Sequence, residues 1–240
     1  FDFAPDGKLV VYHTLTEGLC AHSLADGNRR TLLPPATNVQ FVRFDPAGER
    51  LVIVQTNALQ IWNFAEAKSL WTVPAETYVD WAAWRPDGRL VAAADQRSRD
   101  VLLFDAATGA LLTRFGGHTS TPFIFEFHPA GQWVASTARD STVQVWDRRN
   151  GQVVFKALTG SHHALQFAPD GNRIASGAGT DQIGISEFHL PAVFREFQTT
   201  SQGEVDASWM DTSEDGRFLV TATFSDCRLW DTESQRELFV

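Results

Sequence analysis

Four side chains between Gly116 and Asp147 have residue types that could do chemistry together: His118, Ser136, Asp140 and Trp146. An Asp carboxylate only accepts hydrogen bonds, a histidine ring can donate at one nitrogen and accept at the other, and an indole N–H only donates. His118 and Asp140 could therefore act as an acid and a base, or could satisfy one another structurally. We expect the structural role, because a satisfied charge-assisted bond contributes about 1.5–3 kcal/mol and its loss costs about as much.

Other polar groups carry weaker indications of a metal site or an enzyme. His162 and His163 are adjacent, but neighbouring residues of a strand point to opposite faces, which disfavours joint metal binding. A group of acids surrounds an irregular stretch near the end of the chain, namely Asp206, Asp211, Glu214 and Asp215. No calcium-loop motif accompanies these acids, so a solvated acidic loop is the simpler interpretation. The chain also has no Gly-x-Ser-x-Gly motif for a hydrolase nucleophile. We therefore predict no catalytic residues, no metal and no cofactor.

A pattern that repeats along the whole chain positions these residues. An aromatic residue followed by a turn with Pro or Asp and then Gly recurs at Gly7, Gly48, Gly88, Gly131 and Gly171, and the looser Ser213-Glu214-Asp215-Gly216 is the sixth occurrence. A spacing of about 40–45 residues is that of four-stranded propeller blades. Short apolar runs follow each glycine, and no segment has the 3.6-residue apolar period of a long helix. We predict an all-β, single-domain β-propeller of six four-stranded antiparallel blades, at residues 1–35, 36–75, 76–116, 117–159, 160–199 and 200–240.

The stretch from Gly117 to Asp147 resembles one repeat of the WD-repeat β-propeller family. It opens with Gly117-His118, places Asp140 in a turn and closes with Trp146-Asp147. The resemblance extends unevenly to other repeats, through Trp62-Asn63, Phe104-Asp105 with a retained Asp100, Phe188-His189, and Trp230-Asp231. It implies that His118, Ser136, Asp140 and Trp146 form one hydrogen-bonded chain, which ties two strands to the incoming loop.

The resemblance also suggests how the repeats are used. Seven blades are the family's commonest count and six are visible here, so we expect a six-bladed ring or part of a ring with seven or more. Partners of this family often bind the rim where the innermost strands begin and beside the turn Asp. Transferred to this sequence, the candidate partner-binding residues are Tyr78, Asp80, Arg99, Thr121, Phe123, Arg139 and His163. Tyr and Arg are favoured anchors of interfaces, so we expect Tyr78, Arg99, Phe123 and Arg139 to share one contact patch.

Composition narrows the choice of partner and compartment. The net charge is −9 and the basic residues are scattered, which argues against a nucleic-acid surface. No run of 18 apolar residues and no signal-peptide pattern is visible, so we expect no membrane association and a cytoplasmic location. Cys20 and Cys227 are interpreted as ordinary thiols, with a bridge left open if the ring closes on six units.

The predicted function is a non-catalytic scaffold that binds a protein or peptide partner, as a monomeric domain or as part of a larger chain. The chain is also similar to repeat regions of larger bacterial signalling proteins, including serine/threonine kinases. One alternative is therefore an enzyme-associated or kinase-associated regulatory propeller. The other is a small-ligand sensor that uses the central channel.

Overall fold

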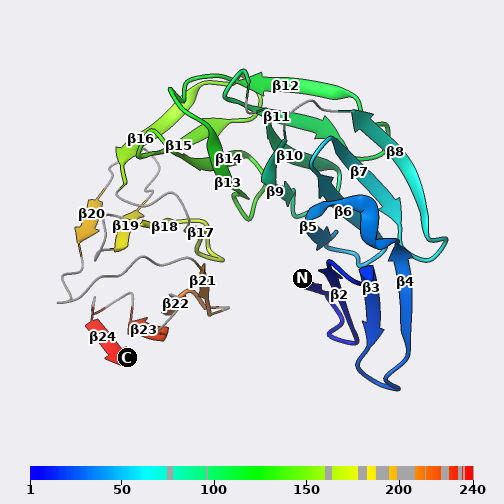
Figure 1. Ribbon diagram of the computed structural model, residues 1–240. Coiled ribbons are helices and arrows are strands. Elements are labelled where there is room, and N and C mark those ends of the chain that lie inside the picture. Colours follow the sequence, from blue (N-terminus) through cyan, green and yellow to red (C-terminus); the bar gives the residue numbers. More distant parts are fainter. Residues whose placement is uncertain are drawn as a thin grey trace. The chain divides into compact units, whose positions relative to one another are not determined.

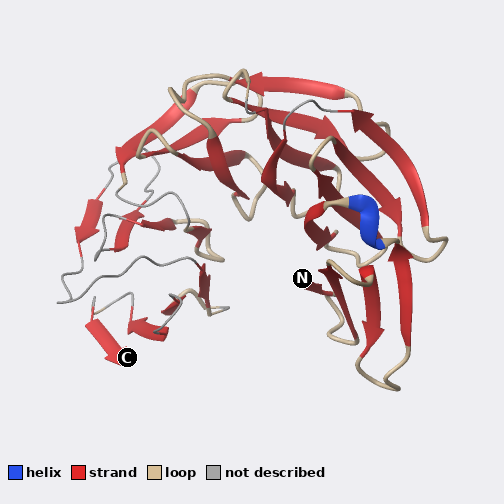
Figure 2. Ribbon diagram, viewed as in Figure 1, coloured by secondary structure: helices blue, strands red, loops and turns tan. Residues whose placement is uncertain are grey.

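In a computed structural model, the chain is built from antiparallel strands (Figures 1 and 2). The residues that the structure describes are 1–74, 78–95, 97–159, 164–177, 183–187, 195–198, 209–213, 215–222, 227–231, 234 and 236–239. These residues form six four-stranded sheets and one 3₁₀ helix, η1 (Pro35–Thr37). Within each sheet the strands follow one another in chain order, so every connection is a hairpin. The predicted all-β fold of six four-stranded antiparallel sheets is confirmed.

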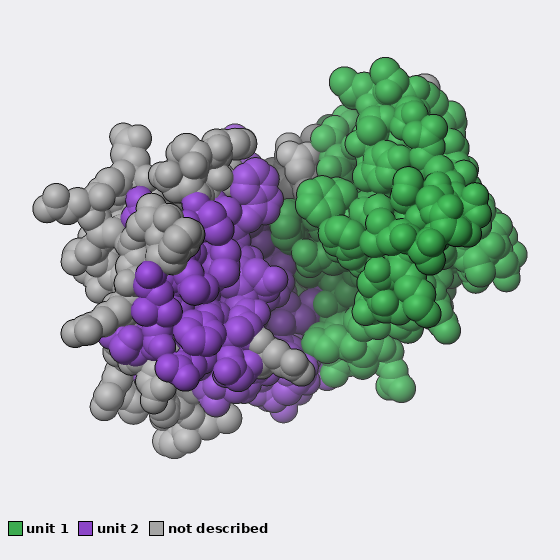
Figure 3. Space-filling view, turned by 90° about the horizontal axis from the view of Figure 1, so that it is seen from below, with its two compact units in different colours: residues 1–116 green, residues 117–240 purple. Residues whose placement is uncertain are grey.

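The chain divides into two compact units, residues 1–116 and 117–240, and each contains three sheets (Figure 3). The division falls at the boundary predicted between the third and fourth repeats. Unit 1 contains β1 (Asp2–Phe3), β2 (Leu9–Thr14), β3 (Gly18–Ser23), β4 (Arg29–Leu33), β5 (Val39–Phe44), β6 (Arg50–Gln55), β7 (Ala58–Asn63), β8 (Lys68–Pro74), β9 (Tyr78–Trp84), β10 (Leu90–Asp95), β11 (Asp100–Asp105) and β12 (Leu111–Phe115). Unit 2 contains β13 (Pro122–Phe127), β14 (Trp133–Ala138), β15 (Thr142–Asp147), β16 (Val153–Leu158), β17 (Leu165–Phe167), β18 (Arg173–Gly177), β19 (Ile183–Glu187), β20 (Arg195–Gln198), β21 (Trp209–Thr212), β22 (Phe218–Ala222), β23 (Cys227–Asp231) and β24 (Arg236–Phe239).

The repeated glycines close the first hairpin of each sheet. Gly131 has φ 67° and Gly171 has φ 72°, in the left-handed region that a residue with a Cβ enters only at a cost. The Gly131 N–H donates to the carbonyl of His128 at 2.6 Å, and the Gly171 N–H donates to that of Ala168 at 2.8 Å. These turns set the register of the strands that follow, which explains why the turn glycines marked the repeats so well in the sequence.

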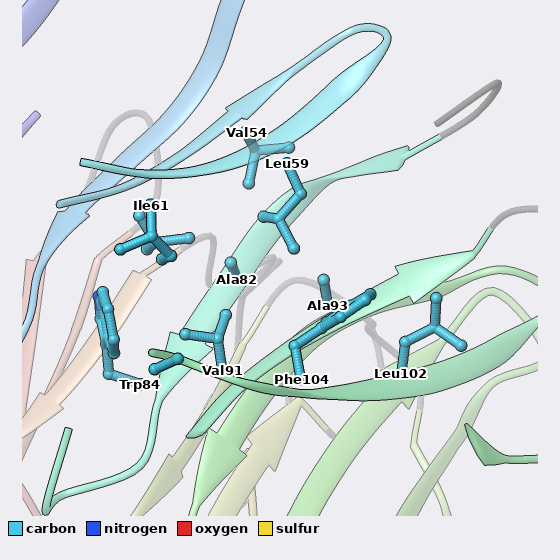
Figure 4. Packing of buried hydrophobic residues seen from close by; sticks show 11 residues of the cluster. Val54, Leu59, Ile61, Ala82, Trp84, Val91, Ala93, Leu102 and Phe104 are labelled. Carbon is cyan, nitrogen blue, oxygen red and sulfur yellow. The ribbon is translucent and has the colours of Figure 1, made fainter. Parts of the chain in front are cut away.

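The core of unit 1 is built by side chains that alternate along the strands. β6 and β7 contribute Val54, Leu59 and Ile61, and β9 to β11 contribute Trp84 and Phe104 among others (Figure 4). Because successive strand residues point to opposite faces, alternate positions of one strand enter the same cluster. Each sheet therefore hides its apolar faces against other sheets of its unit. The thiols of Cys20, which is buried, and Cys227, which is exposed, are both free.

Candidate functional site

The sheet of the fourth repeat, β13 to β16, brings the four predicted network residues together. His118 lies just before β13, Ser136 is in β14, Asp140 is in the turn after it, and Trp146 is in β15. His118 Nε2 lies 2.8 Å from Ser136 Oγ, and the indole N–H of Trp146 donates to that same oxygen at 3.1 Å. His118 Nδ1 lies 3.0 Å from Asp140 Oδ2. The four residues thus form one continuous chain of hydrogen bonds.

The acceptor at Asp140 sets the direction of the hydrogen bonds in this chain. An ionised carboxylate can only accept, so Nδ1 of His118 carries a hydrogen and donates it to Asp140. In the neutral ring Nε2 is then an acceptor, so Ser136 Oγ donates its hydrogen to Nε2 and accepts from the Trp146 indole. Asp140 also accepts from the Thr119 N–H at 2.8 Å, the Thr142 N–H at 3.0 Å and the Thr142 hydroxyl at 2.7 Å. The carboxylate therefore ties the incoming loop to the start of β15.

The electrostatics of the network favour a neutral ring beside a charged carboxylate. Burial lowers the pKa of His118, and the negative charge of Asp140 offsets only part of that shift. Burial alone would raise the pKa of Asp140, but hydrogen bonds from Thr142, Thr119 and His118 outweigh it, so this pKa lies below its usual value. At neutral pH the neutral imidazole described above is thus the stable form.

The order Ser136–His118–Asp140 is also that of a hydrolase triad. The distances from the two His118 ring nitrogens to Ser136 Oγ and to Asp140 Oδ2 would suit such a triad. A nucleophile, however, has to reach a substrate. Ser136 is 0% exposed, and its oxygen already accepts the hydrogen bond from the fully buried indole of Trp146. The arrangement can hold a turn and a loop in place, and it offers no surface on which acyl transfer could occur.

Three of the predicted partner-binding residues lie together at the turn that the network holds. The backbone N–H of Arg139 donates to the carbonyl of Thr121 at 3.0 Å, and its guanidinium lies 4.7 Å from the ring centroid of Phe123. Arg139 is exposed, and Thr121 and Phe123 are half-buried. We call these three residues the Arg139 surface. Because Arg139 directly precedes Asp140, the network fixes the backbone that presents it.

The remaining predicted site residues are distributed differently. Arg99 is exposed in the turn between β10 and β11, has φ 64°, and donates its N–H to the carbonyl of Asp95 at 2.9 Å. Tyr78 and Asp80 lie in β9, but their side chains, like all of His162 and His163, are outside the described residues. Arg99 and the Arg139 surface belong to different units, so a patch common to both stays a prediction.

Asp100 is not the counterpart of Asp140, and the expectation that the third repeat retains the turn acid is wrong. Asp100 is the first residue of β11 and pairs with Asp95, as Thr142 is the first residue of β15 and pairs with Ala138. The connection before Asp100 is longer than the one before Thr142, which displaces the acid into the strand. Its carboxylate lies 3.9 Å from Arg114.

Two residues of the network were missed from the sequence. Thr142 donates twice to Asp140, and Gln144 is 1% exposed with its Nε2 lying 3.3 Å from the Gly117 carbonyl. A signal for both was present, because Thr142, Gln144 and Trp146 alternate along one face of β15. Of the acids near the end of the chain, Asp206 and Glu214 are outside the described residues. Within the described part of the chain, no three His, Cys, Asp or Glu side chains are grouped as metal ligands.

Comparison with known proteins places this geometry in a family. The family model described as "WD domain, G-beta repeat" matches residues 109–147, which include every member of the network. This part of the chain is therefore a WD repeat. The match runs from the fourth strand of one sheet through the third strand of the next, β12 to β15. The six four-stranded antiparallel sheets are consistent with the blades of a WD-repeat β-propeller, and each sheet is called a blade below.

Curated relatives share parts of the chain. Pre-mRNA-processing factor 19 of Schizosaccharomyces pombe is 28% identical over 131 residues, which is 54% of this chain and 26% of that protein. Actin-interacting protein 1-2 of Arabidopsis thaliana is 34% identical over 38% of this chain and 15% of its own length. Target of rapamycin complex subunit wat1 of S. pombe is 36% identical over 31% of this chain and 24% of its own length. The alignments thus span about a quarter of these relatives or less. No helix among the described residues is long and apolar enough to cross a membrane.

Proposed function

We propose that this WD-repeat chain is a non-catalytic platform for protein interaction and that the Arg139 surface contacts the partner. The observation that carries the proposal is the exposed guanidinium of Arg139, held 4.7 Å from the Phe123 ring in a turn that the network fixes. Arg139 is exposed, and no salt bridge of its guanidinium is found within the described residues. A planar cation in this position can bind a carboxylate with two parallel hydrogen bonds.

The fixed turn also lowers the cost of binding. Ordering a rotamer-rich side chain at an interface costs about 0.5–1.5 kcal/mol. Contact with an aromatic ring already restricts Arg139, and such a contact contributes about 0.5–1 kcal/mol at an exposed site. Much of the ordering has therefore occurred before the partner arrives. An arginine beside an aromatic side chain is also a common composition of interface hot spots.

The names of two relatives support the same kind of function. One is named an actin-interacting protein, and another is named a subunit of the target of rapamycin complex. Both names describe proteins that associate with other proteins. For this chain they support a protein partner in general and no particular one.

The test is to capture partners from an extract and compare two charge reversals. Arg139→Glu should weaken capture at least tenfold, while Lys156→Glu, which makes the same charge change at an exposed position of β16 in the same unit, should not. Both variants should unfold at the wild-type denaturant midpoint. If Arg139→Glu binds every captured partner as tightly as the wild type, the proposed surface is wrong. If no protein is captured and a small molecule raises the melting temperature, the scaffold function is wrong as well.

A further inference from the structure

A repeated contact links the first hairpin turn of a blade to the corresponding turn of the next blade. In each case a side chain from one blade reaches the carbonyl of the next blade's turn glycine. In unit 1, Arg50 Nη2 donates to the Gly88 carbonyl at 2.6 Å. In unit 2, Arg173 Nη2 donates to the Gly216 carbonyl at 3.1 Å. The contact between the fourth and fifth blades uses a histidine instead, because His128 Nε2 lies 3.1 Å from the Gly171 carbonyl.

The surroundings of His128 permit only one protonation state. Its Nδ1 accepts a hydrogen bond from the Ala130 N–H at 3.1 Å, so this nitrogen needs a free lone pair. Its Nε2 faces a carbonyl, so this nitrogen needs a hydrogen. The ring is 7% exposed and contacts Trp133 and Phe167 edge to face, with centroids 4.9 and 5.3 Å away. Only the neutral ring with its hydrogen on Nε2 satisfies both neighbours.

We propose that the His128–Gly171 contact is a pH-sensitive link between the fourth and fifth blades. A second proton would go to Nδ1 and would point an N–H at the N–H of Ala130. The ring would then have to leave its position between Trp133 and Phe167, which loosens the turn around Gly171. Arginine stays charged at all relevant pH values, so the equivalent Arg173–Gly216 link does not respond. This device goes beyond the proposed scaffold function and does not depend on it.

Among the described residues, few charged groups lie around His128. Asp170, in the turn that His128 contacts, would favour the extra proton, but Asp170 itself lies 3.8 Å from Arg173 of β18. Arg148 donates to the Gly131 carbonyl of the histidine's own turn at 2.8 Å, and Glu126 of β13 accepts from Gln166 at 2.9 Å. β14 contains no charged residue, and neither does β17. Burial lowers the pKa of His128 by more than the Gly171 carbonyl and Asp170 raise it.

The sign of the effect follows from proton linkage. When the link opens, the pKa of His128 returns toward its ordinary value of 6.5, and in the closed link it is lower. The closed link is therefore fully favoured above pH 6.5 and loses stability as the pH falls from 6.5 toward the closed-state pKa. Over that window the open fraction rises by up to about tenfold for each pH unit.

Hydrogen exchange tests this with a matched control inside the same unit. The Gly171 and Gly216 amides both donate to a turn carbonyl at 2.8 Å, but only the first turn is held by a histidine. After correction for the intrinsic pH dependence of exchange, lowering the pH from 7.5 to 5.5 should speed exchange at Ala130 and Gly171 by up to about tenfold. Exchange at Gly216 should not change. Equal responses at Gly171 and Gly216 would overturn the proposal.

A variant sharpens the same experiment. His128→Gln keeps a side-chain N–H that can reach the Gly171 carbonyl and removes the titrating group. In this variant the ratio of Gly171 to Gly216 exchange should be independent of pH. If the ratio of the two exchange rates still changes with pH as in the wild type, another group titrates and the proposal is wrong. The wild-type comparison needs no variant, so it decides the question even if His128→Gln does not fold.

Discussion

The central hairpins of the third and fourth blades have the same framework and different interiors. β10 and β11 pair over six residue pairs, as do β14 and β15. Where the fourth blade pairs Ser136 with Gln144, the third pairs Ala93 with Leu102. The position of Trp146 in the fourth blade is taken by Phe104 in the third. One hairpin therefore contains a buried polar network, and the corresponding positions of the other are apolar.

The difference separates what the fold needs from what the turn needs. The apolar hairpin of the third blade is as buried as the polar one, so the blade itself does not require the network. The network adds a fixed connection between the incoming loop, the β14–β15 turn and the strand pair, through His118 and Asp140. A buried polar network is costly unless every member is satisfied. Its presence in the fourth blade is thus best explained by the turn it holds, which presents Arg139.

The largest effect that we expect from this comparison is on stability. Asp140→Ala removes the acceptor of His118, of Thr142 and of the Thr119 N–H, and should lower the free energy of unfolding by about 3 kcal/mol. Asp100→Ala in the third blade should lower it by less than about 1 kcal/mol, because its partner Arg114 is half-exposed and 3.9 Å away. Urea denaturation of both variants measures the two losses. Equal losses would mean that Asp100 and Asp140 contribute equally to stability.

A smaller effect is expected from removing only the indole donor. Trp146→Phe makes the fourth blade resemble the third and leaves Ser136 without its donor, which should cost about 1 kcal/mol beyond the lost packing area. Trp230→Phe is a matched test, because the indole of Trp230 donates to the Thr221 hydroxyl at 2.9 Å in the sixth blade. Denaturation curves of the two variants should shift by similar amounts. If both shifts are no larger than the lost packing area accounts for, the indole hydrogen bonds do not contribute to stability.

The pH dependence of stability should follow the histidine of the network. The pKa of His118 is 6.5 when unfolded and lower when folded, so its contribution is fully present above pH 6.5 and is lost as the pH falls toward the folded value. The urea midpoint should therefore be lower at pH 5.5 than at pH 7.5. His128 contributes with the same sign, so the comparison is made in a His128→Gln background. A midpoint that rises on acidification would mean that His118 is protonated in the folded chain.

The smallest effect concerns the Arg139 surface itself. Arg139→Ala removes an exposed cation–ring contact and should lower the free energy of unfolding by about 0.5–1 kcal/mol. The same denaturation experiment checks it. A loss above about 2 kcal/mol would show that Arg139 supports the fold, and the weakened capture expected of Arg139→Glu could then not be assigned to the partner.

Much of the fold could be predicted from the sequence because its determinants are local. Turn glycines such as Gly131 and Gly171 need a positive φ, and the apolar runs after them alternate with period two. The network residues were also predictable, because the resemblance supplied their spacing. In contrast, the role of Asp100 was predicted wrongly, because only the strand register shows that the third blade's longer connection moves this acid into β11.

Contacts between blades were beyond sequence reasoning. His128 was visible only as one residue of the repeated aromatic and Pro-Gly pattern. Its partner Gly171 is 43 residues further along the chain, and nothing local distinguishes a histidine that reaches it from a solvated one. The same holds for the stacking of Arg139 on Phe123, where both residues were candidates but their contact depends on how the turn folds back over β13.

The β14–β15 turn depends most on His118 and Asp140 acting as one unit, and a double-mutant cycle measures this directly. His118→Ala, Asp140→Ala and the double variant would be compared with the wild type by urea denaturation at pH 7.5. We predict a coupling free energy of about 1.5–3 kcal/mol, as for a buried charge-assisted hydrogen bond. If the losses of unfolding free energy in the two single variants simply add up in the double variant, the coupling is near zero. That result would contradict the claim that the network holds this turn.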